Sequence, residues 1–252
     1  MNAIKQQLTA FLSAITLLTR IPLGNGLDFR SETQTASVIY FPIIGMLVGL
    51  AGGLVLILTQ YFHPILAVLL SMLTTVLITG GFHEDGLADA ADGLMGGQTP
   101  ERRLEIMKDS RIGVYGALAL WFSLTLKAIL LYELLKHDLW LTFWGIVIAH
   151  MLGRTSSVGL IYLHSYVSKE NSKFKWAVQK VSRWHFIFGF GAPLFIACFL
   201  LSTKALGCVA AMVITMLASG LYFRRKIGGI TGDCLGAATQ LTELSCYLAL
   251  LL

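Results

Sequence analysis

The chain has 252 residues, of which 56% are hydrophobic and only 13% are charged, with a formal net charge of +5. A soluble domain usually contains about 25% charged residues, so this composition argues against a soluble protein. The four cysteines show no metal-ligand spacing, and the basic residues lie between apolar runs rather than on one polar face. These features argue against a cysteine metal site and against a nucleic-acid-binding protein.

Continuous apolar runs of about 20 residues recur along the chain and predict membrane-spanning helices, because alternating runs would be expected for a barrel. An N-terminal apolar segment, residues 8–23, is short and contains Arg20, so the sequence leaves open whether it spans the membrane, re-enters it or lies at its surface. The sequence predicts an all-α polytopic bundle forming one domain over residues 1–252, with about seven spanning helices. The predicted spans lie at about 38–61, 64–82, 114–135, 139–163, 185–202, 206–223 and 235–252.

The basic residues are divided unevenly between the two sets of loops. On one side only Lys136 and Lys204 are basic, whereas the other side has 13 Lys and Arg residues, in the loops 23–37, 83–113, 164–184 and 224–234. Because basic loops stay in the cytoplasm, this bias predicts that the second set is cytoplasmic. Within that set, the Lys- and Trp-containing loop 164–184 resembles an anchor at the membrane interface.

Four acidic residues follow the apolar run that ends near residue 80. In a helix, Asp85, Asp89 and Asp92 share one face within an arc of about 60°, whereas Glu84 lies about 100° away. Like charges on adjacent turns repel, and a divalent cation reverses that interaction. Oxygen ligands without cysteine favour Mg²⁺, with Mn²⁺ as an alternative, so the three aspartates are predicted metal ligands. The other interpretation is a solvated helix face.

Residues 99–113 predict a short amphipathic helix on the membrane, begun by Thr99 and followed by a basic turn. Lys108 and Arg111 next to Gly113 suit phosphate oxygens, and Asp109 between them is a further candidate catalytic residue. Contact with anionic lipid is the alternative interpretation of these cations.

Charged residues inside the predicted spans need a partner or a cavity, because an unpaired charge in lipid is unfavourable. Arg154 is predicted to bind a substrate phosphate or carboxylate, or else to form an ion pair with an aspartate of the acidic stretch or with Glu243. Lys127 either extends to the membrane surface or pairs with Glu133 or Glu243.

A second basic turn precedes the last span. Lys226 and Asp233 flank glycines there, and both are candidate substrate-binding residues; Asp233 is alternatively a simple N-cap. Glu84 and His83 are weaker candidates for substrate binding, and His83 is also explained as a hydrogen-bonding residue near the interface.

Carboxylates for a divalent cation, combined with Arg and Lys at glycine turns, indicate phosphoryl transfer, which depends mainly on positioning and charge neutralisation. The chain has no GxxxxGK[ST] motif, so it is not a P-loop NTPase.

Several motifs resemble the cobalamin synthase (adenosylcobinamide-GDP ribazoletransferase) family. They are GGFHEDGLADAADGL (80–94), EIMKDSRIGVYG (105–116), GGITGDCLGAATQL (228–241), LTRIPL (18–23) and YFPIIGMLVG (40–49). The resemblance implies a multi-pass enzyme of the bacterial inner membrane that joins adenosylcobinamide-GDP to α-ribazole or its 5′-phosphate, uses Mg²⁺ and releases GMP. Implied partners are membrane lipid, a second copy of the chain and other corrinoid-assembly enzymes.

On this resemblance, Asp85, Asp89 and Asp92 hold Mg²⁺ across the substrate diphosphate, assisted by Glu84 or Asp233. The expected neutralising cations are Lys108, Arg111, Arg154 and Lys226, and Asp109 is expected to position the acceptor hydroxyl or a cation.

Three other classes fit less well. A CDP-alcohol phosphotransferase needs an Arg where this chain has Asp89, and a prenyltransferase needs a second acidic motif that this chain lacks. A transporter is the non-enzyme alternative, with Lys127, His150 and Arg154 lining an ion pathway, but no internal repeat is apparent.

Overall fold

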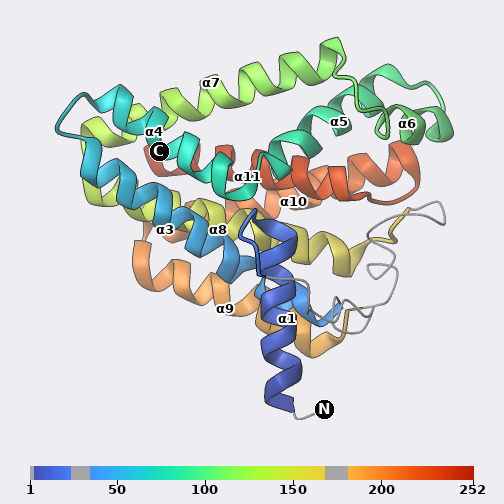
Figure 1. The fold of residues 1–252 in the computed structure, drawn as a ribbon, viewed down its shortest axis with the longest axis horizontal. Coiled ribbons are helices and arrows are strands. Elements are labelled where there is room, and N and C mark those ends of the chain that lie inside the picture. Colours follow the sequence, from blue (N-terminus) through green and yellow to red (C-terminus); the bar gives the residue numbers. More distant parts are fainter. Residues whose placement is uncertain (1–2, 24–34, 168–180) are drawn as a thin grey trace.

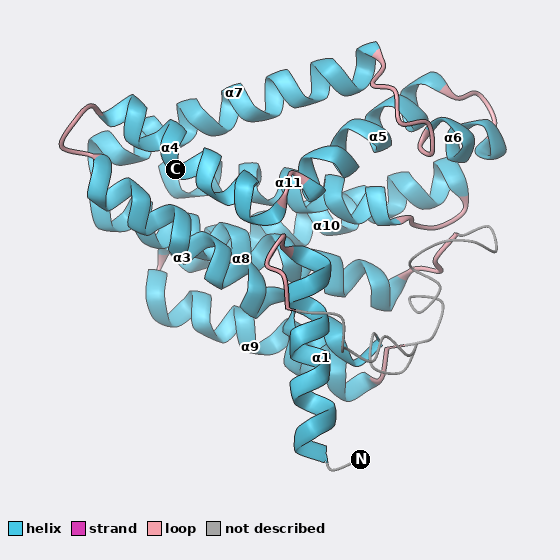
Figure 2. Ribbon diagram, viewed as in Figure 1, coloured by secondary structure: helices cyan, strands magenta, loops and turns pink. Residues whose placement is uncertain are grey.

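The computed structural model describes residues 3–23, 35–167 and 181–252, and these residues form a helical bundle (Figures 1 and 2). Apart from one isolated bridge between Tyr166 and Ile230, they contain no β structure. The helices are α1 (Ala3–Leu18), the 3₁₀ helix η1 (Val38–Tyr40), α3 (Phe41–Thr59), α4 (Pro64–Thr79), α5 (Phe82–Gly96), α6 (Pro100–Ile106), α7 (Val114–His137), α8 (Leu139–Leu163), α9 (Arg183–Leu201), α10 (Lys204–Ile227) and α11 (Gly232–Leu251).

The described residues include six helices that are long and apolar enough to cross a membrane, and α4 with α5 forms a bent pair that makes a seventh when the pair is taken as one span. Large apolar side chains such as Leu58, Trp121 and Phe195 are exposed on the bundle, as expected for contact with lipid. The predicted multi-pass all-α fold is therefore confirmed. The predicted span at 64–82 needs a correction, because α4 ends at Thr79 and the chain then turns sharply.

Helix α8 occupies the centre of the bundle. Of the most apolar 18 residues in each span, 89% are buried in α8 but only 22% in α9. Three glycines of α3 allow the two helices to approach closely: a Cβ added to Gly49 would lie 2.7 Å from Cα of Val147, and Gly45 and Gly53 face α8 in the same way. Small residues at a helix contact are the usual means of close packing in membranes.

The N-terminal helix α1 does not belong to this set of spans. Its 16 residues correspond to about 24 Å, which is shorter than the hydrocarbon core of about 30 Å. Ile4 and Leu8 are exposed, and the helix projects from the bundle with only its C-terminal part packed against it (Figure 1). By its length, α1 is therefore not among the candidate spans.

A glycine elbow between α4 and α5 determines where the acidic stretch lies. Gly80 and Gly81 have φ of 68° and 70°, in the left-handed region that favours glycine. The N–H of Gly81 donates to the carbonyl of Val76 at 3.0 Å and thereby ends α4. The two helices are bent by 85°, which turns α5 towards α7 and α11.

The two elbow glycines should differ in their tolerance of substitution. Gly81→Ala should lower stability by about 1 kcal/mol, because a Cβ in the left-handed region is strained but meets no atom within 4 Å. Gly80→Ala should be more destabilising, because its Cβ would collide with Arg20. Thermal unfolding of the purified protein in detergent measures both.

Gly228→Ala is the matched control, since Gly228 also has a positive φ and open surroundings. Equal melting temperatures for the Gly80 and Gly81 variants would contradict the close contact described for Gly80.

Candidate functional site

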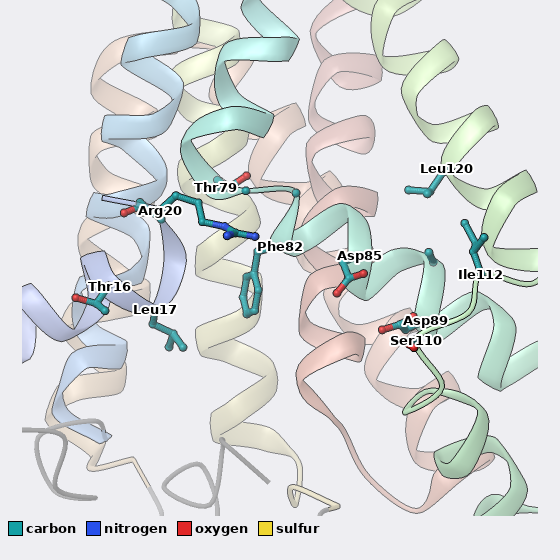
Figure 3. Close-up of a pocket in the computed structure, with 14 residues that line it drawn as sticks. Thr16, Leu17, Arg20, Thr79, Phe82, Asp85, Asp89, Ser110, Ile112 and Leu120 are labelled. Carbon is teal, nitrogen blue, oxygen red and sulfur yellow. The ribbon is translucent and has the colours of Figure 1, made fainter. Parts of the chain in front are cut away.

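A cavity of about 540 Å³ lies where the end of α1, the elbow, α5 and the start of α7 meet (Figure 3). Its polar lining includes the carboxylates of Asp85 and Asp89, the guanidinium of Arg20 and the hydroxyl groups of Thr79 and Ser110. A single cavity therefore brings together acidic and basic groups from segments that are far apart in the sequence.

Asp85 and Asp89 lie one helical turn apart on α5 and both face the cavity, as the helical spacing predicted for this pair (Figure 3). Asp85 is exposed and Asp89 is partly buried. Asp89 experiences the charges of Asp85, Asp233 and Asp92, so negative charge is concentrated on this side of the cavity. Such a concentration favours a cation or a cationic group of a ligand.

Asp92 has a different environment from its two neighbours. It is buried, and its carboxylate accepts hydrogen bonds from the backbone N–H groups of Gly113 at 2.7 Å and Gly116 at 2.9 Å. These are otherwise unpaired donors at the start of α7, so an aspartate of α5 caps a neighbouring helix. Both oxygens are thereby used in packing, and the side chain does not line the cavity.

The predicted three-aspartate ligand set is therefore not preassembled. Across residues 3–23, 35–167 and 181–252, no three His, Cys, Asp or Glu side chains are arranged to hold one metal ion. The helical face is correct for Asp85 and Asp89, but the contact with α7 draws the third aspartate away.

Asp233 lies in the first turn of α11, beside the acidic pair. The N-cap of α11 is Thr231, whose hydroxyl accepts a hydrogen bond from the N–H of Cys234 at 3.2 Å, so the alternative of Asp233 as N-cap is wrong. Helices α5 and α11 touch here: a Cβ added to Gly86 would lie 3.1 Å from the carbonyl oxygen of Asp233. Because the helices cross closely here, the negative charges of Asp233 and Asp85 repel each other.

The basic turn before α7 makes contacts of its own. Arg111 and Asp109 form an exposed ion pair with a separation of 2.6 Å, and hydrogen bonds from Arg111 lower the pKa of Asp109 to about 2. Asp109 is therefore anionic at physiological pH and is a weak proton acceptor. Lys108 is exposed and acts electrostatically on Asp233. The N–H of Gly113, the glycine beside these cations, donates to Asp92.

Lys226 lies at the end of α10 and does not line the cavity. Its Nζ lies 5.5 Å from the centre of the Tyr222 ring, and its carbonyl accepts a hydrogen bond from Nη1 of Arg103 at 2.7 Å. The structure thus places Lys226 beside α6 rather than facing Asp85 and Asp89.

A buried ionic network is centred on Glu243 of α11, and its residues do not line the cavity. The Glu243 carboxylate contacts Nζ of Lys127 at 2.7 Å, Nδ1 of His150 at 2.9 Å and the guanidinium of Arg154. Glu243 is 0% exposed, and its partners are nearly as buried. Of the alternatives that the sequence left open, Arg154 and Lys127 both pair with Glu243.

The network also holds the beginning of α5. Nη2 of Arg154 lies 3.3 Å from Nδ1 of His83, and Nε2 of Gln240 donates to Oε1 of Glu84 at 3.0 Å. His83 and Glu84 point into the bundle and do not line the cavity. They immediately precede Asp85, so the network orients the helix that carries the acidic pair.

Sequence reasoning did not select Arg20, Thr79 or Ser110 as site residues, although all three line the cavity. The available signal was an arginine at the end of an apolar segment, two residues before Pro22. That signal places a charge near the membrane surface but does not identify what it faces.

The fold and the site together define a multi-pass helical membrane protein with an acidic cavity at the ends of its helices, flanked by cations and held by a buried ionic network. Within that class, the chain belongs to the family described as cobalamin-5-phosphate synthase, whose model matches residues 10–251. The match covers nearly the whole chain and confirms the family that the motifs indicated.

Curated relatives agree with this family. A protein of Shewanella amazonensis named adenosylcobinamide-GDP ribazoletransferase is 43% identical over 258 residues, which cover 100% of this chain and 98% of the relative. Proteins of the same name from Shewanella baltica and Shewanella pealeana are each 41% identical, over 98% and 100% of this chain and 95% and 98% of their own lengths. No solved structure matches the chain.

Glu243→Gln should strongly destabilise the protein. The substitution leaves Lys127 and Arg154 as buried cations without a counter-charge, and breaking a buried pair in this way costs about 3–5 kcal/mol. The melting temperature and the folded yield in detergent measure the effect.

Glu133→Gln is the control, because Glu133 pairs with Lys136 on the exposed surface and such pairs add little stability. If both variants had the same melting temperature as the unsubstituted protein, the network would have no structural role.

Proposed function

We propose that this chain transfers the adenosylcobinamide-phosphate group from adenosylcobinamide-GDP to α-ribazole or α-ribazole 5′-phosphate. The observation that carries the proposal is the full-length similarity to proteins named adenosylcobinamide-GDP ribazoletransferase. A cavity with carboxylates on one side and a cation on the other is suited to a substrate that contains a diphosphate.

The transfer exchanges one P–O bond for another. A ribose hydroxyl of the ribazole attacks the phosphorus that remains with cobinamide, the bond from that phosphorus to the GMP oxygen breaks, and the hydroxyl proton is released. The products are GMP and adenosylcobalamin or its 5′-phosphate. Such a reaction requires alignment and charge neutralisation more than a strong base, which is compatible with an Asp109 that remains anionic and paired with Arg111.

Mg²⁺ is the proposed cofactor, and Mn²⁺ is its alternative. Mg²⁺ is commonly bound by one or two carboxylates together with substrate phosphate oxygens. Asp85 and Asp89, with Asp233 nearby, fit that pattern, and no third protein ligand is needed if the diphosphate supplies the remaining oxygens. When bound, the ion would neutralise charge on the phosphoryl groups.

The remaining predicted residues take different proposed roles. Arg111 lies between Ser110 and Ile112 of the cavity lining, and Lys108 lies two residues before Ser110; both cations remain proposed ligands of the departing GMP. Arg154, His83 and Glu84 are proposed to position α5 rather than to bind substrate, because their contacts lie within the buried network. Lys226 and Asp92 have packing roles in this proposal.

The bacterial inner membrane is the proposed location, with the cavity on the cytoplasmic side. The support is the excess of basic residues in the loops before α7 and after α10, next to the cavity and Asp233. Of the predicted interface anchor at 164–184, residues 168–180 lie outside the described residues. Lipid, a second copy of the chain and other corrinoid-assembly enzymes remain proposed partners.

The direct test uses the purified protein in liposomes with adenosylcobinamide-GDP and α-ribazole. We expect GMP and a corrinoid product in the presence of Mg²⁺ and neither in the presence of a chelator. Failure to release GMP in the complete mixture would remove the proposed activity.

Asp89→Asn should reduce turnover at least about 100-fold, because it removes a charged ligand of the proposed metal while leaving the fold intact. The variant should retain its melting temperature, and initial rates over a Mg²⁺ titration measure the loss.

Asp92→Asn provides the comparison on the same helix. Its amide retains one acceptor oxygen but loses a hydrogen bond at the start of α7, so stability should fall by about 1–2 kcal/mol, with turnover within about tenfold of the unsubstituted protein. If a folded Asp92 variant were as inactive as the Asp89 variant, Asp92 would belong to the metal site after all.

A further inference from the structure

Arg20 is held at the elbow by two separate contacts. Its backbone N–H donates to the carbonyl of Ile78, near the end of α4, at 2.7 Å. Its side chain lies directly over Gly80, where an added Cβ would be 2.6 Å and 2.8 Å from Cγ and Cδ of the arginine. The segment that follows α1 is therefore packed closely against the turn that orients α5.

This packing places a guanidinium in the cavity that contains Asp85 and Asp89. Arg20 enters from the side of α1 and the elbow, whereas the two carboxylates enter from α5 (Figure 3). Within the described part of the chain, neither Asp85 nor Asp89 forms an ion pair with Arg20. The cation and the acidic pair thus share one cavity without neutralising each other by direct contact.

Arg20 is also the one cation among the described residues that line this cavity. Lys108 and Arg111 are not among the lining residues, and Arg111 pairs with Asp109. Lys226 and Arg154 make their contacts elsewhere. An arginine has a planar fork of donors that matches two oxygens of a phosphate, which a lysine does not reproduce.

We infer that Arg20 binds the diphosphate of the nucleotide substrate opposite the metal-binding carboxylates, so that the oxygens of the diphosphate are contacted from both sides. This inference rests on the proposed function. It makes the end of α1 part of the substrate site and assigns Arg20 as a substrate-binding residue. The competing explanation is that Arg20 only clamps the elbow.

The test compares Arg20→Ala, Arg20→Lys and Lys5→Ala in the full-length purified protein. Lys5 is an exposed cation on α1 outside the cavity, so it is the matched control. Calorimetry measures binding of pyrophosphate and of GDP in the presence of Mg²⁺, and steady-state kinetics separates KM from kcat for each substrate. Melting temperatures are measured on the same samples.

Arg20→Ala should weaken Mg²⁺-dependent pyrophosphate binding at least about tenfold and raise KM for adenosylcobinamide-GDP by a similar factor. KM for α-ribazole should be unchanged, and Lys5→Ala should behave as the unsubstituted protein. Arg20→Lys should bind pyrophosphate less tightly than the unsubstituted protein at an unchanged melting temperature, which decides the question if the alanine variant does not fold.

Unaltered pyrophosphate affinity in both Arg20 variants would overturn the inference. Arg20 would then only hold the elbow in place. A protein without transferase activity that still binds pyrophosphate through Arg20 would refute the proposed function alone. A folded, unsubstituted protein that binds neither pyrophosphate nor GDP would refute this inference.

Discussion

The rest of the structure depends on the buried ion pairs that the carboxylate of Glu243 forms. This carboxylate is fully buried among apolar helices, yet it contacts Lys127 of α7 and both His150 and Arg154 of α8. Charges in such surroundings are tolerated only when they are paired, so these helices have few alternative arrangements. Through His83 and Glu84 the same network reaches α5. The position of the acidic pair is therefore determined by electrostatics in the interior as well as by apolar packing.

The elbow between α4 and α5 determines where the acidic pair lies. A straight continuation of α4 would have carried Asp85 and Asp89 along the axis of the span, whereas the turn at Gly80 and Gly81 bends α5 by 85°. The Asp92 carboxylate then accepts hydrogen bonds from backbone N–H groups at the start of α7. One acidic helix therefore both faces a cavity and supports its neighbour. The charge of Asp92 is stabilised by the N-terminus of α7, whereas Asp85 and Asp89 have no such partner within the described residues.

Apolar runs and helical spacing were sufficient to predict a multi-pass helical bundle and the face shared by Asp85 and Asp89, because both depend on local periodicity. Spacing was misleading for Asp92, whose partners are backbone groups 21 and 24 residues away. The sequence raised Glu243 as a partner of Arg154 but could not choose it, because their contact joins residues 89 positions apart. Arg20 was not selected as a site residue because its neighbours are set by the elbow. The predicted uninterrupted span at 64–82 contained no such turn.

The close packing of Gly86 on α5 against the first turn of α11 also constrains how the protein is made. Arg20 and α5 precede α11, the helix that contains Asp233 and Glu243, in the chain. Because a chain is synthesised from its N-terminus, Lys127 and Arg154 are made before Glu243, their buried counter-charge on α11. The position of α5, and with it that of Asp85 and Asp89, is consequently complete only when α11 is in place.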